Sequence, residues 1–140
     1  MKIFLDCDVL LDVGLRRELF RQYSEPILDH LQLHPGKGFM AWHTVANLYY
    51  IMAKTAKPEA AKSFVLRLCD FMTIAPCSNS QVELAASMEM QDFEDALQCA
   101  AALAVNADFI ITRNLEDYQT APIPVYSPAA AMAHLEEPVE

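Results

Sequence analysis

The sequence predicts an α/β protein whose mostly parallel sheet is covered by helices on both faces. Short apolar runs of strand length alternate with longer segments in which apolar residues recur at helical spacing. The first run, residues 2–6, is apolar on both faces, as a central strand of a parallel sheet is. Chains that alternate strand and helix in this way build parallel sheets with helices on both sides.

The individual elements follow from local patterns. After the first strand, Ser24 and Pro26 suit the start of a helix over residues 24–33. Residues 34–38 form a turn before a short apolar stretch, and apolar spacing around Leu48 then marks a second helix. The later expected elements are a helix at 58–69, a strand at 72–75, helices at 80–88 and 92–104, strands at 108–112 and 124–126, and a helix at 128–135.

Helix caps and chain organisation complete this prediction. Ser80 and Glu83 have the spacing of a capping pair, and Asp92 stands where it would cap the following helix. The Glu-rich C-terminal tail is expected to fray. Because the 140 residues contain no repeat, low-complexity segment or linker, we expect a single domain spanning residues 1–140.

Composition restricts the classes of function. With 19 acidic and 10 basic residues the net charge is −9, which argues against broad, non-specific binding to nucleic acid. A phosphate-containing substrate stays compatible with this charge, because bound divalent cations reverse the local field. The apolar runs are too short for a membrane span, and the N-terminus enters a strand directly, so we expect a cytoplasmic protein.

Cysteine and glycine patterns exclude further site types. The four cysteines show no C-x-x-C spacing, and their apolar surroundings predict buried free thiols instead of a zinc cluster or disulfides. The three glycines do not follow the first strand, so the chain lacks a nucleotide-binding glycine loop.

Acidic residues follow two of the predicted strands and begin one helix. Asp6 directly follows the first strand, and a carboxylate buried there is costly unless it is paired or bound to metal. Ligands of parallel α/β sheets bind beyond the carboxyl ends of the strands, so Asp6 is our first candidate for a metal ligand. The alternative is a structural Asp that caps the next turn. Asp8 lies near the same turn, where it is expected to bond the backbone and shape the loop.

Two further acidic segments are expected at the same edge. Asp92 and Asp95 share a face at a helix N-terminus, so we assign capping mainly to Asp92 and metal ligation to Asp95. Asp117 follows the strand at 108–112 by a loop long enough to fold back over the sheet. Thr112 and Asn114 could orient its carboxylate, although ordinary capping and loop roles would explain each of these residues as well.

The three acidic segments together resemble the successive motifs of PIN domains. They are Leu5-Asp6-Cys7-Asp8-Val9-Leu10-Leu11-Asp12, Asp92-Phe93-Glu94-Asp95-Ala96-Leu97-Gln98 and Thr112-Arg113-Asn114-Leu115-Glu116-Asp117-Tyr118. Their order and spacing are most similar to the small prokaryotic group that includes VapC-type toxins.

This resemblance implies a three-layer α/β/α sandwich and a metal-dependent endoribonuclease, the toxin of a toxin–antitoxin pair. By position, Asp6, Asp95 and Asp117 match acidic ligands and catalytic residues of the family, with Mg²⁺ or Mn²⁺ as the cofactor. Where the family has a second-motif Glu, this chain has Asn47, which resembles a subgroup with Asn-Leu/Ile-Tyr-Tyr in that helix. An Asn offers a neutral oxygen, so we expect weaker metal binding.

The expected partners are RNA, an antitoxin protein and further copies of the chain through its apolar helices. Arg16, Arg17 and Arg113 are candidates for contacts to the RNA backbone, with solvated surface charge as the alternative for each. Trp42, Tyr49 and Tyr50 are expected in the core or at a dimer interface.

Two other functions compete with a nuclease. A PIN-like module could bind RNA or protein without cleavage, which Asn47 and the acidic surface favour. A haloacid-dehalogenase-like phosphatase could use Asp6 as nucleophile and Asp8 as acid/base. That family also needs a downstream Lys, and none follows Lys62.

Overall fold

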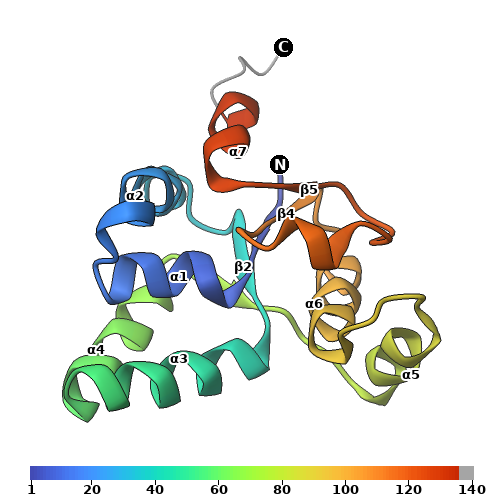
Figure 1. Cartoon of the computed structure of the whole chain (residues 1–140), viewed down its shortest axis with the longest axis horizontal. Coiled ribbons are helices and arrows are strands. Elements are labelled where there is room, and N and C mark those ends of the chain that lie inside the picture. Colours follow the sequence, from blue (N-terminus) through green and yellow to red (C-terminus); the bar gives the residue numbers. More distant parts are fainter. Residues whose placement is uncertain (136–140) are drawn as a thin grey trace.

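The computed structural model describes residues 1–135, and its centre is a five-stranded parallel sheet with the order β3-β2-β1-β4-β5 (Figure 1). All four strand pairings are parallel, which confirms the predicted α/β class. The strands are β1 (Ile3–Leu5), β2 (Gly38–Met40), β3 (Met72–Ile74), β4 (Phe109–Ile111) and β5 (Val125–Tyr126). The helices are α1 (Cys7–Gly14), α2 (Glu18–Leu33), α3 (Trp42–Thr55), α4 (Pro58–Leu68), α5 (Asn79–Ser87), α6 (Phe93–Ala104), the 3₁₀ helix η1 (Leu115–Tyr118) and α7 (Pro128–Leu135).

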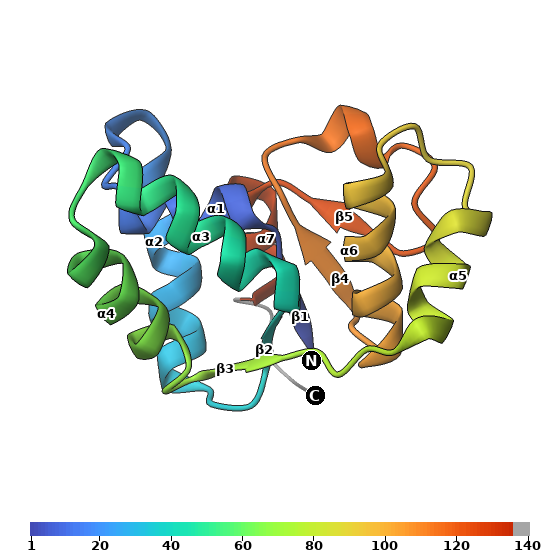
Figure 2. The same ribbon diagram turned by 90° about the horizontal axis from the view of Figure 1, so that it is seen from below.

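Helices cover both faces of the sheet and form the expected three layers. Helices α1 to α4 lie on one side, and α5 and α6 lie on the other (Figure 2). Side chains alternate across the pleat, so Ile3 and Leu5 of β1 pack on the α1 side while Phe4 packs on the α6 side. The central strands are apolar on both faces because both of their faces are buried.

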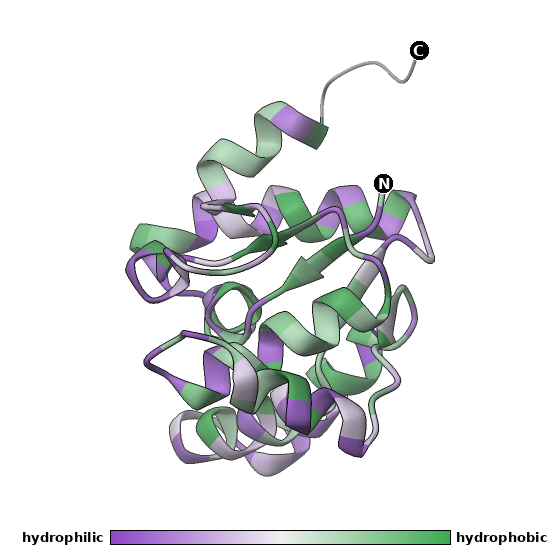
Figure 3. Ribbon diagram, turned by 90° about the vertical axis from the view of Figure 1, so that its right-hand side faces the viewer, coloured by the Kyte–Doolittle hydropathy of each residue, from purple (hydrophilic) through white to green (hydrophobic). Residues whose placement is uncertain are grey.

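Hydropathy follows this layering. The strands are coloured mostly hydrophobic, whereas the helices carry hydrophilic stretches on their outer surfaces (Figure 3). Within residues 1–135, the helices lack the combination of length and apolar character that a membrane crossing requires.

The segment between β1 and β2 differs from the prediction. Helix α1 was not predicted, although Asp6 caps it, and α2 begins at Glu18 instead of near Ser24. Pro26 therefore lies inside α2. The first turns of α2 show no core-facing pattern because Leu19 and Tyr23 are exposed, so periodicity alone could not locate this helix start.

Helix α5 shows a second difference. Its capping box uses Ser78 and Gln81, so the predicted pair of Ser80 and Glu83 was wrong by two residues. Both pairs have the same i, i+3 spacing, and Pro76 leaves room for either start. The predicted cap at Asp92 is present, since its Oδ1 accepts a hydrogen bond from the Asp95 backbone N–H at 3.1 Å.

Several side chains are more exposed than predicted. Cys7 and Cys99 are buried free thiols, but Cys69 and Cys77 are exposed. Trp42, Tyr49 and Tyr50 are exposed on α3 by 71%, 44% and 63%, which contradicts the core alternative and leaves the dimer interface as a prediction. The Glu-rich end of the chain, 136–140, lies outside the described residues.

Candidate functional site

The ends of β1 and β4 place Asp6 and Thr112 beside each other. The Asp6 backbone N–H donates to Ile111 O at 3.0 Å, which continues the strand pairing by one residue. Both side chains are buried, Asp6 at 8% exposure and Thr112 at 0%. The parallel sheet therefore brings two polar side chains from opposite ends of the sequence to its carboxyl edge.

The carboxylate of Asp6 is held by four hydrogen-bond donors. Oδ1 accepts from Cys7 N–H at 2.7 Å and from Gln98 Nε2 at 3.1 Å. Oδ2 accepts from Thr112 Oγ1 at 2.8 Å and from Tyr118 Oη at 3.2 Å. Four donors match the approximate capacity of an ionised carboxylate. Asp6 thus both caps α1, as one sequence interpretation held, and accepts hydrogen bonds at the centre of a polar network.

A cluster of three acids, Asp92, Asp95 and Asp117, lies beside this network. One carboxylate oxygen of each lies within 4.8 Å of the others, although the three residues come from the start of α6 and from η1. The structure therefore brings Asp95 and Asp117 together, as the sequence predicted. It adds Asp92, which was assigned mainly to capping and both caps α6 and lies in this cluster. The third predicted ligand, Asp6, is not part of this cluster.

Tyr118 connects Asp6 with the acidic cluster. Its hydroxyl donates to Asp6 Oδ2 at 3.2 Å, and it lowers the pKa of Asp95 when its single proton turns toward that carboxyl instead. The pKa of Asp95 is nevertheless raised to about 7, first by burial and then by the negative charges of Asp6, Asp92 and Asp117. Carboxylates that repel one another in this way are stabilised as anions when a cation binds between them.

Asp8 lies on the other side of Thr112. Its Oδ2 accepts from the Arg113 backbone N–H at 3.1 Å and lies 3.4 Å from Thr112 Oγ1, while its buried Oδ1 has no hydrogen-bond partner. Burial and the charge of Asp6 raise the pKa of Asp8 to about 6. Asp8 thus bonds the backbone of the loop after β4, which is the role expected from its position near a turn.

Asn114 orients Asp117. Its Nδ2 donates to Asp117 Oδ2 at 2.6 Å, and its backbone N–H donates to Thr112 Oγ1 at 3.0 Å. Asn114 therefore contacts the Asp117 carboxylate directly. Thr112 links Asp6 to the loop that carries Asp117 through the Asn114 backbone.

Asn47 contacts an acid that the sequence interpretation did not single out. Its Nδ2 donates to Glu94 Oε1 at 3.0 Å, so α3 and the first turn of α6 meet at this pair. Gln98 and Tyr118 were also not predicted as site residues. Their positions in the quoted motifs could have indicated them, since Gln98 follows Glu94 by one helical turn and Tyr118 follows Asp117.

The three candidate RNA-contacting arginines differ in their surroundings. Arg113 forms a bidentate pair with buried Asp12, through Nε to Oδ2 at 2.7 Å and Nη2 to Oδ1 at 3.0 Å. Arg17 Nη1 lies 3.6 Å from Asp12 Oδ1. Arg16 has a left-handed backbone, with φ of 51°, between α1 and α2. Much of the Arg113 guanidinium is therefore committed to a structural partner.

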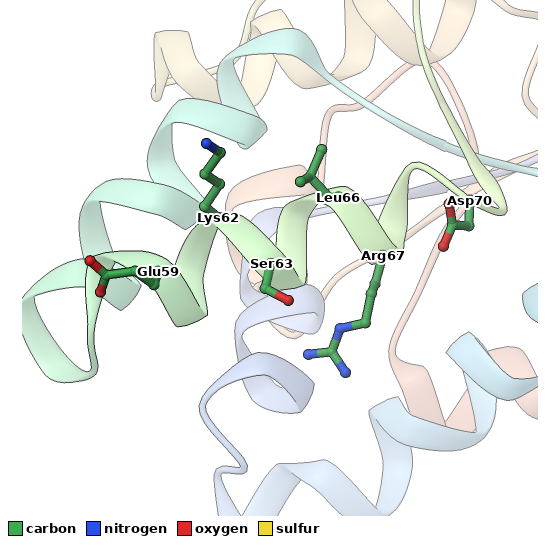
Figure 4. Close-up of a pocket in the computed structure, with 6 residues that line it drawn as sticks. All are labelled: Glu59, Lys62, Ser63, Leu66, Arg67 and Asp70. Carbon is green, nitrogen blue, oxygen red and sulfur yellow. The ribbon is translucent and has the colours of Figure 1, made fainter.

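A separate hollow lies along α4, on the opposite side of the sheet from α6 and its Asp95 (Figure 2). Glu59, Lys62, Leu66 and Arg67 contribute to its lining, and Lys62 points to a different side of the helix from Arg67 (Figure 4). The volume is about 340 Å³. Its charged groups do not converge on one point, so it does not compete with the acidic cluster as a site for chemistry.

The donor set at the cluster suits a hard divalent cation. Asp92, Asp95 and Asp117 offer carboxylate oxygens alone, which Mg²⁺ and Mn²⁺ prefer, and no His or Cys belongs to the group. A family profile described as PIN domain matches residues 2–116, a range that includes Asp6, Asp92 and Asp95. The chain belongs to the PIN domain family. PIN domains are typically nucleases and usually depend on metal.

Solved structures similar to this PIN domain include VapBC2 from Rickettsia felis bound to a DNA fragment from their promoter. The TM-score is 0.71 at 16% identity, and the match covers 91% of this chain and 98% of the other. A toxin–antitoxin complex from Klebsiella pneumoniae gives 0.68 at 19% identity, with the same coverage. VapC20 from Mycobacterium tuberculosis, a Sarcin-Ricin loop cleaving toxin, gives 0.63 at 13% identity, covering 78% of this chain and 87% of the other.

At these identities the structural likeness establishes the fold. No curated protein gives a significant match to the sequence. Membership of the PIN family sets aside the haloacid-dehalogenase-like phosphatase alternative, because the match assigns the first strand and its Asp6 to a PIN domain.

Proposed function

We propose that this PIN domain is a Mg²⁺- or Mn²⁺-dependent endoribonuclease. The observation that carries the proposal is the meeting of Asp92, Asp95 and Asp117 within 4.8 Å, directly beside the buried Asp6 network. Bound divalent cations supply Lewis-acid activation of water and stabilisation of the charge that develops on the scissile phosphate. The remaining chemistry is the work of the protein's own side chains.

Asp95 and Asp117 are proposed as the principal metal ligands and catalytic residues, with Asp92 beside them. Asn114 fixes the carboxylate of Asp117, and the first turn of α6 favours the negative charges of Asp92 and Asp95 through the helix dipole. These contacts hold the two ligands in place before metal binds, which reduces the reorganisation that binding requires.

Asp6 is proposed as a further ligand that Tyr118 releases. Of the four donors to its carboxylate, Tyr118 makes the longest contact, at 3.2 Å, and it is the donor that also acts on the pKa of Asp95. Rotation of this one hydroxyl would free an Asp6 oxygen toward the cluster. Thr112 and Gln98 would keep the other lone pairs fixed.

The similar structures also suggest a biological setting. One of them is described as a toxin–antitoxin complex, and another is described as a Sarcin-Ricin loop cleaving toxin. We therefore propose that this chain is the toxin of such a pair, with RNA as substrate, an antitoxin protein as partner and self-association through its apolar helices. Asn47, in place of the second-motif Glu, is proposed to mark a subgroup of PIN domains.

The test is metal-dependent cleavage of a panel of labelled single-stranded and hairpin RNAs. Cleavage is expected with Mn²⁺ and is expected to disappear with chelator, and to fall by about 10²-fold or more in Asp95→Asn and Asp117→Asn, since each removes a charged ligand. Glu83→Gln, an exposed acid on α5, is the control for loss of one negative charge. Cleavage that persists in both aspartate variants would contradict the proposal.

A non-catalytic binding module is the second candidate, because Asn47 lacks the charge of the expected Glu and the chain carries a net charge of −9. The same RNA panel separates the two functions. Binding without cleavage, unaffected by chelator and by Asp95→Asn, would favour the module.

A further inference from the structure

Two hydrogen bonds join α3 to α6 as successive rungs. The inner rung runs from Gln98 Nε2 to Thr44 Oγ1 at 3.2 Å, and the outer rung runs from Asn47 Nδ2 to Glu94 Oε1 at 3.0 Å. Thr44 and Asn47 are three residues apart on α3, and Glu94 and Gln98 are four residues apart on α6, so each pair shares a helix face. Glu94 therefore lies about one helical turn, or roughly 5.4 Å, from the rung that also touches Asp6.

We infer that Glu94, held by Asn47, supplies the carboxylate that the second-motif position on α3 does not provide in this chain. The inference rests on the proposed metal-dependent function. Where the family pattern has a carboxylate on α3, this chain has the neutral amide of Asn47, and the carboxylate that it contacts comes from Glu94 on α6. Asn47 is then a positioning residue, because it acts on the metal site through Glu94.

The charge of Glu94 reaches the centre of the site from the α3 side. Burial lowers the pKa of His43 on α3, and the negative charges of Glu94 and Asp6 act in the opposite direction. Glu94 thus lies close enough to act on the same group as Asp6.

Unpartnered polar atoms lie in the same gap between α3 and α6. Gln98 is fully buried, and its Oε1 has no hydrogen-bond partner although its Nε2 bonds both Asp6 and Thr44. The buried Nε2 of His43, one turn before Asn47 on α3, also lacks a partner. Buried polar atoms are rarely left unpaired in native proteins, so Gln98 Oε1 and His43 Nε2 have the capacity to bond a further polar group here.

Glu94 and its neighbour Asp95 approach the Asp6 network from different sides. Consecutive helix residues point about 100° apart, so Asp95 lies on the side of Asp117 and Tyr118 while Glu94 lies on the side of α3. Carboxylates then approach the Asp6 network from two sides. In this arrangement an acid lies on the α3 side of the site, although α3 itself contributes no acidic residue there.

The test is the Mn²⁺ dissociation constant, measured by isothermal titration calorimetry on the whole chain, with circular dichroism to confirm folding. Glu94→Gln is expected to weaken binding on the order of 10-fold or more, by loss of a ligand. The exchange variant, Asn47→Glu with Glu94→Gln, is expected to restore most of the affinity, because it moves the carboxylate across the same contact. Asn47→Ala is expected to weaken binding less than Glu94→Gln does.

Glu59→Gln is the matched control, because Glu59 also lies in the first turn of a helix, on α4, and the change removes the same charge. If the Glu94→Gln and Glu59→Gln variants have the same Mn²⁺ dissociation constant, the inference is overturned. So would an exchange variant that is folded but binds Mn²⁺ no better than Glu94→Gln.

A further comparison separates this failure from failure of the proposed function. Asp95→Asn is measured alongside, and loss of binding in Asp95→Asn with full binding in Glu94→Gln would overturn the role of Glu94 alone. Absence of Mn²⁺ binding by the wild-type chain would overturn both proposals.

Discussion

Arg113 and Asp12 form a bidentate ion pair that joins the end of β4 to α1. Arg113 Nε and Nη2 donate to the two carboxylate oxygens of Asp12 at 2.7 and 3.0 Å, and Asp12 is fully buried. The guanidinium also stacks on Phe20, with Cζ 3.8 Å from the ring centroid, and Ser24 Oγ donates to Asp12 at 3.0 Å. The pair fixes the loop that begins with Thr112 against the helix that follows Asp6.

Loss of Arg113 is therefore expected to destabilise the fold. Arg113→Ala leaves the buried Asp12 carboxylate with weaker partners, so we expect the free energy of unfolding to fall by about 2 to 3 kcal/mol. Urea denaturation of the metal-free protein measures this change. Arg21→Ala is the control, because Arg21 pairs with Glu25 on the exposed surface of α2 and such pairs contribute less than about 1 kcal/mol. Equal effects of the two changes would show that the buried pair does not stabilise the fold.

Thr112→Val tests the hydroxyl that connects Asp6 to the loop. The change keeps the side-chain shape but removes the donor to Asp6 Oδ2 and the acceptor for the Asn114 N–H. We expect a loss of about 1 to 3 kcal/mol in unfolding free energy, because a hydrogen bond to a buried charge is removed. Thr73→Val, at an exposed position on β3, is the control and is expected to change stability little. A small effect at position 112 would mean that Tyr118 and Gln98 suffice to hold Asp6.

The stability of the metal-free protein is expected to fall as pH rises. The pKa of Asp95 in the folded protein is about 7 and that of Asp8 about 6, both above the ordinary value near 4 for the unfolded chain. The folded state therefore binds these protons more tightly than the unfolded state. Their stabilising contribution is complete below about pH 4 and is lost as pH rises through the folded values.

Thermal unfolding at about pH 5 and about pH 8, with and without Mg²⁺, measures this effect. The cation favours the ionised carboxylates, so its stabilisation is expected to be larger at the higher pH. Asp95→Asn removes one of the two groups and should flatten the pH dependence of the metal-free protein. A wild-type profile without any Mg²⁺ effect at either pH would contradict the expectation.

Tyr118→Phe tests the hydroxyl between Asp6 and Asp95. Because a hydrogen bond from Tyr118 lowers the pKa of Asp95, its loss is expected to raise that pKa above the wild-type value. A ¹³C NMR titration of the aspartate carboxyl groups in metal-free protein measures the shift. Tyr126→Phe is the control, since its ring packs edge-on against Phe109 in the core on the other face of the sheet. An unchanged pKa in Tyr118→Phe would show that this hydroxyl bonds Asp6 alone.

The sequence by itself determined the class of fold and the acidic character of the site. Strand-length apolar runs between helical segments fixed the parallel sheet, because burial on both faces requires apolar residues at every strand position. Asp6, Asp95 and Asp117 could be selected because each lies at the edge of an element. The same patterns could not locate the start of α2 or choose Ser78 over Ser80 as a cap, since local spacing fits both alternatives.

Only the tertiary structure decided which side chains meet. It grouped Asp92 with Asp95 and Asp117, surrounded Asp6 with donors from α6, η1 and the residue after β4, and paired Asn47 with Glu94 across two helices. The Asn47–Glu94 pair joins residues 47 positions apart, and the Asp6–Tyr118 pair joins residues 112 positions apart. Helical and strand periodicity describe which face a residue occupies, but the distance between two faces is set by how the layers pack.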